Sequence, residues 1–295
     1  MGLAVPRGPR VKALFIVNPR SGAGRRDVRQ TIERHCKDTF EIVECPPKEE
    51  LDPVIERAKR ESFDVIYAVG GDGTVHEVAK RLVGSRVALG IIPTGSGNGL
   101  ARHLGFPIDV RQALCTTPRA ATVDTAAING IPFVGTMGVG FDAWVADAFA
   151  SSGVRGLRSY IRVGLDGFLK YKPETYQIEV DGDKLERRAL LIAIANASQY
   201  GNNARIAPVA SLQDGVLDLV IVERASLGGA VRLFAGSLHR AKGITMRRGR
   251  HIVIRRPAPG PAHLDGEPVS LPETLTIDIV PRSLRVLVPE SARAI

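Results

Sequence analysis

The chain has 295 residues and a mass of 31.7 kDa, which predicts two domains or one elaborate α/β unit. Its 44% hydrophobic and 24% charged residues exclude an intrinsically disordered chain. The excess of 40 Lys and Arg over 31 Asp and Glu gives a net charge of +9, so we expect an anionic partner, unless the excess reflects only the composition of the source genome.

The first 115 or so residues alternate between short apolar runs and helical patterns, as in a βαβ array. The expected strands are Val11–Asn18, Phe40–Glu44, Asp64–Val69 and Val87–Ile92. The expected helices are Asp27–Lys37, Leu51–Arg60, Thr74–Val83 and Asn98–Leu104.

From about Ala120 onward, strand-like segments separated by Gly, Asn and Pro predict a mainly antiparallel β region. The expected strands are Thr122–Asn129, Pro132–Met137, Tyr176–Asp181, Ala189–Asn196, Val216–Val222, His251–Arg255, Thr274–Val280 and Leu284–Val288. Two helices are expected, Phe141–Ala150 continuing towards Lys170 and Leu227–Leu238.

A short stretch of small residues at Thr116–Thr122 resembles a linker. We therefore expect an N-terminal domain over residues 1–119 and a β-rich domain over 120–283, with residues 284–295 returning to the first.

The clearest candidate site is the turn Gly70-Gly71-Asp72-Gly73-Thr74, which follows the strand Asp64–Val69. Its glycines allow a close backbone approach to a ligand, and Thr74 with Glu77 has the spacing of a capping box. A helix N-terminus of this kind suits a phosphate. The alternative is an ordinary βα turn in which Asp72 is only a turn residue.

Two further loops follow neighbouring strands. Pro93–Gly99 contains Ser96 and Asn98 between glycines, and Pro19–Arg26 adds glycines and arginines. Because ligands bind at the carboxyl ends of strands in open α/β sheets, these loops should lie side by side. Taken singly, each is equally well a flexible surface turn.

Other nucleotide motifs are absent or misplaced. The chain has no Walker A loop and no protein-kinase signature such as HRD or DFG. Gly138–Ala143 has the form G-x-G-x-x-A but lies in the β-rich half, so we do not expect a dinucleotide site there.

Four motifs together resemble the diacylglycerol kinase catalytic family, which includes bacterial soluble lipid kinases, sphingosine kinases and ceramide kinases. They are NPRSGAGR (Asn18–Arg25), GGDGT (Gly70–Thr74), GSGN (Gly95–Asn98) and LDGE (Leu264–Glu267). The match spans nearly the whole chain, whereas GGDGT alone is also shared with NAD kinases.

This resemblance implies an α/β N-terminal domain with a doubly wound sheet like that of NAD kinase and phosphofructokinase, and a C-terminal β-sandwich. ATP would lie in the cleft between them. The implied nucleotide-binding residues are Gly70, Gly71, Asp72, Gly73 and Thr74, with Gly95, Ser96 and Asn98 beside them and Asn18 below.

The resemblance also implies that Asp265 of LDGE is the general base, with Glu267 two residues further on. A carboxylate that accepts the hydroxyl proton suits phosphoryl transfer. Without the other motifs, LDGE would more simply be a hairpin turn with two solvated acids.

Bacterial members carry a structural Mg²⁺ in a segment that resembles Ser211–Val216. Asp214 would supply a carboxylate, and Ser211 and Val216 would supply carbonyl oxygens, which suit Mg²⁺. An Asp-Gly hairpin turn is the competing interpretation. A second Mg²⁺ should arrive with ATP.

Two departures from the family pattern affect what can be transferred. GSGNG replaces the GTxND of many bacterial diacylglycerol kinases and is closer to sphingosine and ceramide kinases, which leaves the acceptor lipid open. Cys45–Lys48 stands where many relatives have a Thr that touches the nucleotide, so that contact is not transferred.

We therefore expect an ATP-dependent kinase of diacylglycerol or of a sphingoid or ceramide-like lipid. The alternatives are an NAD kinase-like enzyme with a soluble substrate and a catalytically silent lipid- or nucleotide-binding regulator. With 5% aromatic residues and no recognisable binding module, we do not expect nucleic acid as a partner.

Basic residues could hold the protein against anionic lipid headgroups. They are Arg155, Arg158, Arg162, Lys170 and Lys172, together with the segment Arg240–Arg256. A solvated helix face is the simpler interpretation of the first group. A homodimer is compatible with the sequence but not indicated by it.

The lack of targeting signals and the cysteine usage predict a cytoplasmic protein, which we expect to be in peripheral contact with the inner membrane face. The N-terminus lacks a signal-peptide pattern, and no apolar stretch is long enough to span a bilayer. The 3 cysteines form no CxxC pair and the 6 histidines are scattered, which indicates a reducing compartment and no zinc site.

Overall fold

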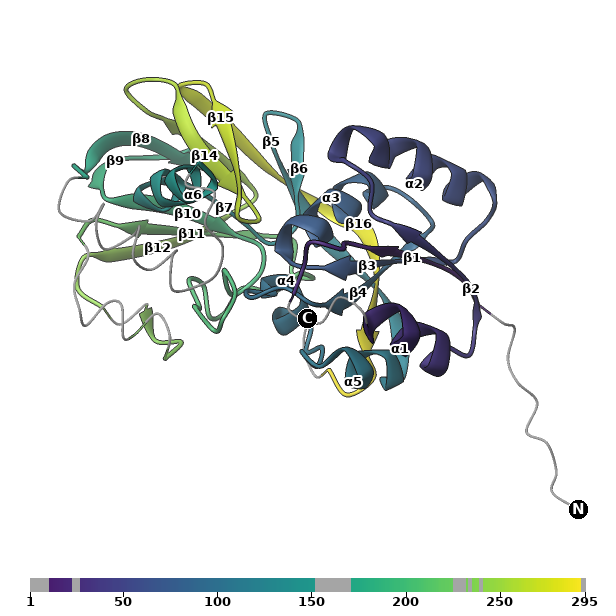
Figure 1. Ribbon diagram of the computed structural model, residues 1–295. Coiled ribbons are helices and arrows are strands. Elements are labelled where there is room, and N and C mark those ends of the chain that lie inside the picture. The colour runs from purple at the N-terminus through teal and green to yellow at the C-terminus, as the bar shows by residue number, and fades with distance from the viewer. Residues whose placement is uncertain are drawn as a thin grey trace, which may run out of the picture.

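The computed structural model describes residues 11–22, 27–151, 171–224, 232, 235–238 and 241–292. Within these residues lie a 10-stranded sheet and a 6-stranded sheet. An α/β half at the N-terminal end and a β-rich half lie next to each other, as Figure 1 shows.

Four parallel strands form one end of the larger sheet, in the order β2-β1-β3-β4. They are β1 (Lys12–Val17), β2 (Thr39–Glu44), β3 (Val65–Gly70) and β4 (Ala88–Pro93). The last two are nearly continuous apolar runs, as expected for parallel strands that are covered on both faces.

Helices cover both faces of these strands (Figure 1). They are α1 (Asp27–His35), α2 (Leu51–Arg60), α3 (Asp72–Leu82), α4 (Gly99–His103) and α5 (Val110–Cys115), with a short 3-10 helix at Lys48–Glu50. Ile55 and Val78 bring α2 and α3 into one core cluster, and Ile32 and Ala113 bring α1 and α5 into another. Two separate cores on opposite faces define a doubly wound layer.

The strand β16 (Thr274–Pro289) joins the two halves of the molecule. It pairs in parallel with β4 through Val286 and Leu89, and antiparallel with β5 (Pro118–Ile128) and β13 (His251–Arg255). A register shift between Val280 and Leu284 interrupts its pairing with β5. The two strands expected here are therefore one strand with an irregularity.

The smaller sheet is antiparallel and has the order β12-β11-β10-β7-β14-β15. Its strands are β7 (Thr136–Gly140), β10 (Leu191–Ala195), β11 (Leu217–Val222), β12 (Ile244–Gly249), β14 (Gly260–Leu264) and β15 (Glu267–Leu271). It packs on the larger sheet through a core that includes Phe133, Ile192 and Ile254. The expected fold class, an α/β layer followed by a mainly antiparallel β-sandwich, is confirmed.

Several expected boundaries are wrong. Thr116–Thr122, expected as a linker, contains the start of β5, because Pro118 onward pairs with β16. Pro132–Met137 divides between β6 (Ile131–Phe133) and β7. The sequence analysis also missed some short elements, namely α5, β9 (Asp183–Ala189), β12, β14 and β15.

The helix α6 (Phe141–Ser151) begins where expected, and its expected continuation towards Lys170 lies outside the described residues. Most of the expected helix Leu227–Leu238 also lies outside them. In the parts of the chain that the structure describes, no helix is long and apolar enough to cross a membrane.

Candidate active site

The loops that follow β1, β3 and β4 meet at one edge of the parallel sheet. Asn18 Nδ2 donates a hydrogen bond to Thr74 Oγ1 at 2.8 Å, which joins the first loop to the second. Thr94 Oγ1 donates to Ser21 Oγ at 2.8 Å, which joins the third loop to the first. The structure thus brings together the loops that the sequence singled out.

Two glycines let the second and third loops touch through their backbones. A Cβ atom on Gly71 would lie 3.2 Å from the Cα of Gly95, and a Cβ on Gly95 would collide with the Cα of Gly71. Side chains at either position would push the loops apart.

Asp72 holds these loops together rather than pointing into solvent. Its carboxylate accepts hydrogen bonds from the backbone amides of Gly99 at 2.6 Å and Asn98 at 2.8 Å. Burial raises the pKa of Asp72, the two amides oppose that shift, and the charge of Asp265 adds to it. Asp72 therefore connects the turn after β3 to the start of α4.

The expected capping box is wrong. The helix α3 begins at Asp72 with Gly71 as its N-cap, and the Val75 amide bonds to the Gly71 carbonyl at 3.0 Å. Thr74 therefore lies inside the first turn, where its hydroxyl accepts from Asn18. The start of an 11-residue helix still offers free amides to an anion.

The polar residues of the third loop have different environments. Asn98 is buried, and its side chain bonds to both the amide and the carbonyl of Gly95, which stabilises the loop itself. Ser96 is exposed. Of the two residues, Ser96 is the one whose side chain is accessible to a ligand.

A two-residue turn of the β14–β15 hairpin carries Asp265 into the cleft between the halves. Asp265 and Gly266 both have positive φ, 51° and 87°, as a tight hairpin turn requires. The Asp265 amide bonds to the carbonyl of Thr136 at 2.7 Å, which ties the turn to β7. The hairpin interpretation and the functional one are therefore compatible.

The carboxylate of Asp265 accepts four hydrogen bonds. The donors are the amides of Val134 at 3.0 Å, Gly135 at 2.7 Å and Thr136 at 2.9 Å, and Nδ1 of His76 at 2.8 Å. Burial acts to raise its pKa, but His76 and these amides outweigh burial, so the pKa of Asp265 is lowered. The group is held as an anion.

His76 was not singled out by the sequence analysis. It lies on α3, one turn after Asp72, and is only 5% exposed. The hydrogen bond to Asp265 spans 189 residues of sequence, so no local pattern indicates it.

Glu267 contacts the N-terminal half from the same hairpin. It lies against Gly73, where any Cβ atom would collide with its Oε1. Lys48 Nζ donates to Glu267 Oε2 at 2.6 Å and lies 3.5 Å from Glu77 Oε1. Glu267 therefore connects the hairpin to α3 and the Lys48 turn.

Glu77, expected to cap α3, is instead the centre of an ion-pair network. Burial acts to raise its pKa, but hydrogen bonds from Lys80 and Arg81 and the charges of Lys80 and Lys48 lower it to about 2. The network keeps Glu77 charged and links α3 to the Lys48 turn.

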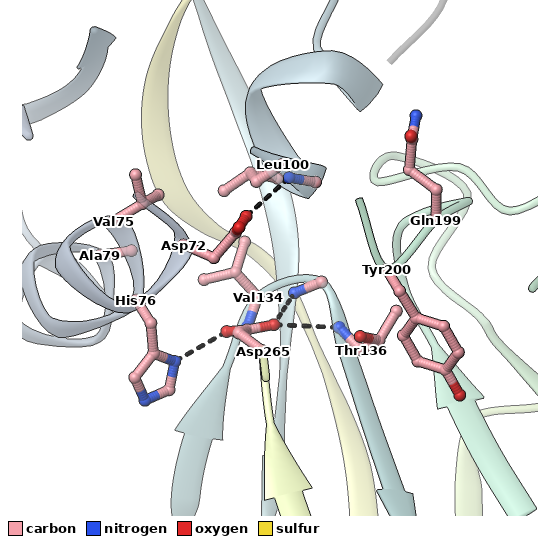
Figure 2. Close-up of a pocket in the computed structure, with 12 residues that line it drawn as sticks. Asp72, Val75, His76, Ala79, Leu100, Val134, Thr136, Gln199, Tyr200 and Asp265 are labelled. Atoms are coloured by element: carbon pink, nitrogen blue, oxygen red, sulfur yellow. Dashed lines mark hydrogen bonds and ion pairs between the residues drawn. The ribbon is translucent and has the colours of Figure 1, made fainter. Parts of the chain in front are cut away.

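A pocket between the two halves contains both aspartates. Figure 2 shows Asp265 between His76 and the backbone of Val134 to Thr136, with Asp72 on the neighbouring helix. The apolar lining residues are Val75, Ala79, Leu100 and Val134. The pocket therefore combines two acids with an apolar wall.

Two family models cover most of the chain. Residues 12–128 match the diacylglycerol kinase catalytic domain, and residues 135–288 match the YegS C-terminal NAD kinase beta sandwich-like domain. The chain belongs to the diacylglycerol kinase family. Kinase and transferase are the activity class of that family.

Named relatives in this family are similar along most of their length. The chain is 29% identical to a "Probable lipid kinase YegS-like" of Klebsiella pneumoniae over 94% of this chain and 96% of the relative. It is 28% identical to a "Diacylglycerol kinase" of Bacillus subtilis over 82% of this chain and 80% of the relative.

Solved structures show the same fold. A diacylglycerol kinase from Bacillus anthracis aligns with a TM-score of 0.70 at 20% identity, over 97% of this chain and 100% of that one. An NAD kinase from Archaeoglobus fulgidus in complex with ATP aligns with a TM-score of 0.53 at 14% identity, over 96% and 95%.

The carboxylate expected at the family's structural Mg²⁺ site is paired with an arginine in this structure. Asp214 forms an ion pair with Arg248, whose guanidinium also lies 3.3 Å from Asp218. In the described parts of the chain, no group of three or more His, Cys, Asp or Glu side chains could hold a metal ion. The one carboxylate expected among Ser211, Asp214 and Val216 is thus neutralised by an arginine.

In the structure, the G-x-G-x-x-A segment packs against buried polar side chains. A Cβ atom on Gly138 would collide with the carboxylate of Asp142 and meet Nε2 of His263 at 2.5 Å. Tyr200 donates its hydroxyl to the same carboxylate at 2.9 Å. The glycine therefore makes room for a buried polar cluster between α6 and the face of the smaller sheet that is opposite the inter-sheet core.

Proposed function

We propose that this chain is an ATP-dependent lipid kinase that transfers the γ-phosphate of ATP to the hydroxyl of diacylglycerol or of a sphingoid or ceramide-like lipid. The observation that carries the proposal is the pocket that contains both Asp72, from the glycine turn, and Asp265, from the hairpin. One half of the molecule offers a phosphate site, and the other offers an anionic group beside it.

The nucleotide side of the proposal rests on backbone groups. The free amides at the start of α3, the accessible hydroxyl of Ser96 and the contact between Gly71 and Gly95 suit a phosphate chain at this edge. Mg²⁺ bound with ATP would neutralise charge on the phosphates. Gly70, Gly73, Thr74 and Asn18 complete the proposed nucleotide site by shaping the two turns.

The acceptor side rests on Asp265 and the apolar wall. A carboxylate held as an anion supplies the negative charge that draws the proton from an acceptor hydroxyl. Val75, Leu100 and Val134 give the pocket an apolar wall beside that charge. This combination suits an alcohol on an apolar molecule better than the polar ribose of NAD.

We further propose peripheral contact with anionic membranes. Arg247, Arg250 and Arg255 are exposed on β12, β13 and the turn between them, within the basic segment singled out by sequence. Arg155, Arg158, Arg162 and Lys170, the other expected contacts, lie outside the described residues, whereas Lys172 lies within them. Binding to anionic but not neutral vesicles, lost in Arg247→Glu/Arg250→Glu, tests this contact.

Transfer of labelled γ-phosphate tests the proposed activity. Wild type and Asp265→Asn are incubated with labelled ATP, Mg²⁺ and mixed micelles that contain diacylglycerol, monoacylglycerol, sphingosine or ceramide, with NAD in a parallel reaction. Labelled product from one lipid, absent with the variant, is expected. Label on NAD alone would assign a soluble substrate, and no label despite ATP binding would favour a regulatory role.

A further inference from the structure

The three backbone amides that hold the Asp265 carboxylate belong to one short segment, Val134–Thr136, where β6 ends and β7 begins (Figure 2). Val134 and Gly135 lie in neither strand. The pairing of strands therefore does not fix the direction in which their N–H groups point. Other contacts must hold these amides towards the carboxylate.

Asn196, which directly follows β10, bonds to the carbonyl side of this segment. Its Nδ2 donates to the carbonyl of Val134 at 2.8 Å, and its backbone amide donates to the carbonyl of Gly135 at 2.8 Å. Because a peptide unit is planar, the Val134 carbonyl fixes the direction of the Gly135 N–H, and the Gly135 carbonyl fixes that of the Thr136 N–H. These two N–H groups are the donors to Oδ1 of Asp265, at 2.7 Å and 2.9 Å.

Both hydrogens of Asn196 Nδ2 are used, since the second bond goes to the carbonyl of Asp124 at 2.9 Å. Two carbonyl acceptors require an NH₂ group, so the orientation of this amide is settled by its partners. The residue is 0% exposed, and within the described residues its Oδ1 has no hydrogen-bond partner. An unpaired buried oxygen lowers stability, so the contribution of Asn196 lies in what its donors hold in place.

We propose that Asn196 is a positioning residue for Asp265, because it holds the two peptide units whose N–H groups donate to Oδ1. This inference rests on the proposed lipid kinase activity and leaves the acceptance of the proton to Asp265. Asn196 does not line the pocket and acts through Gly135, which has no Cβ atom and can turn its peptide unit once the Val134 carbonyl is released. The carboxylate then loses a donor that offsets its burial.

Four titratable groups surround Asp265. From α3, His76 donates to it and Asp72 lines the same pocket. Tyr200 lines the pocket from the loop after β10, and Glu267 on the same hairpin is paired with a lysine. A neutral substitution of Asn196 leaves the charges of all four unchanged, so a changed titration of Asp265 reports on its amide donors.

The test compares wild type with Asn196→Leu, which is similar in size but has no side-chain donor, and with Asn196→Ser, which keeps one. The control is Asn129→Gly, which removes a side-chain bond to the carbonyl of Thr274 at an exposed turn and suits the positive φ of that position. We measure kcat between about pH 5 and about pH 9, with ATP and the accepted lipid saturating. The carboxyl ¹³C signal of Asp265 is titrated in each protein.

The expected result is a pH-dependent loss of turnover. At about pH 6, kcat of Asn196→Leu should be about 10- to 100-fold below wild type, as expected for one lost hydrogen bond to a charged group. The loss should shrink as pH rises, because the Asp265 carboxyl regains its charge. Asn196→Ser should lose less, ATP affinity should be unchanged in both, and Asn129→Gly should match wild type. Asp265 should titrate at higher pH in both Asn196 variants than in wild type.

The other outcomes separate positioning from packing. Reduced kcat with Asp265 titrating as in wild type would assign Asn196 a packing role and overturn the proposal, as would unchanged kcat in Asn196→Leu. Should neither variant fold, wild type decides: titration of Asp265 below the ordinary range of aspartates would support the proposal, and titration within or above that range would overturn it. Absence of transfer by wild type would overturn the proposed function, and the carboxyl titration would still decide the role of Asn196.

Discussion

Asp72 and Asp265 lie in two turns that face each other across one pocket, and both carboxylates accept hydrogen bonds from backbone amides. Their pKa values nevertheless shift in opposite directions, up for Asp72 and down for Asp265. Burial acts to raise the pKa of both, and the difference lies in what opposes it. Two amides do not offset burial at Asp72, whereas three amides and a histidine more than offset it at Asp265.

The comparison teaches that hydrogen-bond donors, rather than exposure, decide the role of each acid. Asp72 holds two loops in place and needs only to accept from Asn98 and Gly99. In the proposed reaction Asp265 stays ionised beside an acceptor hydroxyl, and it is surrounded by enough donors to do so. Substitutions at the two aspartates should therefore affect different kinetic constants.

The largest effect is expected from Asp265→Asn. Asparagine tolerates the positive φ of this position, so the turn should survive, but the amide cannot hold the anionic charge. We expect kcat to fall about 10³-fold with unchanged ATP affinity, measured by transfer assays and by calorimetry. Unchanged turnover would remove Asp265 from the reaction.

Asp72→Asn should act on binding rather than on turnover. The new side-chain NH₂ group would face the backbone N–H of Asn98 or Gly99. Both groups are buried donors, and neither would then have an acceptor. ATP affinity should fall about 10- to 100-fold, a loss of about 1.4–3 kcal/mol, while kcat changes less. A fall in kcat at constant ATP affinity would instead show that Asp72 takes part in the reaction, and the proposed difference between Asp72 and Asp265 would be wrong.

Gly95→Ala tests whether the two glycine loops must touch. The added methyl group would collide with the Cα of Gly71 and separate the loops, so ATP affinity should fall about 10-fold. Gly260→Ala is a matched control, because its Cβ would meet only the side chain of Arg256, at 3.7 Å. Equal ATP affinity in both variants would show that the contact between the two loops does not contribute to ATP binding.

A third acid, Asp218 on β11, extends the comparison away from the cleft. Burial raises its pKa to about 6, with Arg248 opposing that shift and Asp214 adding to it. Between these two pKa values the folded protein keeps a proton that the unfolded chain has lost. The resulting contribution to the free energy of unfolding is fully present below the unfolded pKa of about 4 and is lost as pH rises through 6.

The measurement is Tm between pH 4 and pH 7 without nucleotide. The Tm of wild type should fall by about 2–4 °C between pH 4 and pH 7 because of Asp218, and the Tm of Asp218→Asn should fall by less. Asp183→Asn, at an exposed position on β9, should follow wild type. A Tm curve for Asp218→Asn that is parallel to wild type would show that burial does not govern this acid.

The smallest effect is expected from Lys48→Met, which removes the ion pairs to Glu267 and Glu77 between the halves. The Lys48 side chain is 56% exposed, so the loss of stability should be about 0.5–1 kcal/mol and should shrink at high salt. Denaturant unfolding at low and high salt measures it, with Lys184→Met on β9 as the control. A loss well above this range would make Lys48 a principal connection between the halves.

Local patterns predicted the N-terminal half well. The bounds of α2 match the expected helix, and β1, β3 and β4 each lie within one residue of expectation at both ends. The helix has a clear apolar period and the three strands are apolar runs that end at glycine-rich turns, and both patterns are visible in a short window. The short strands β9, β12, β14 and β15 were missed because polar residues, prolines or glycines interrupt their apolar alternation.

The sequence by itself determined that this chain has glycine-rich loops at one edge of a parallel sheet, an antiparallel second half and an acidic LDGE turn, because each is encoded in neighbouring residues. Only the tertiary structure decided that one strand, β16, joins both halves, that His76 reaches Asp265, and that Arg248 neutralises Asp214. Those contacts join residues far apart in the chain, and their geometry is set by how the two sheets pack rather than by any local propensity.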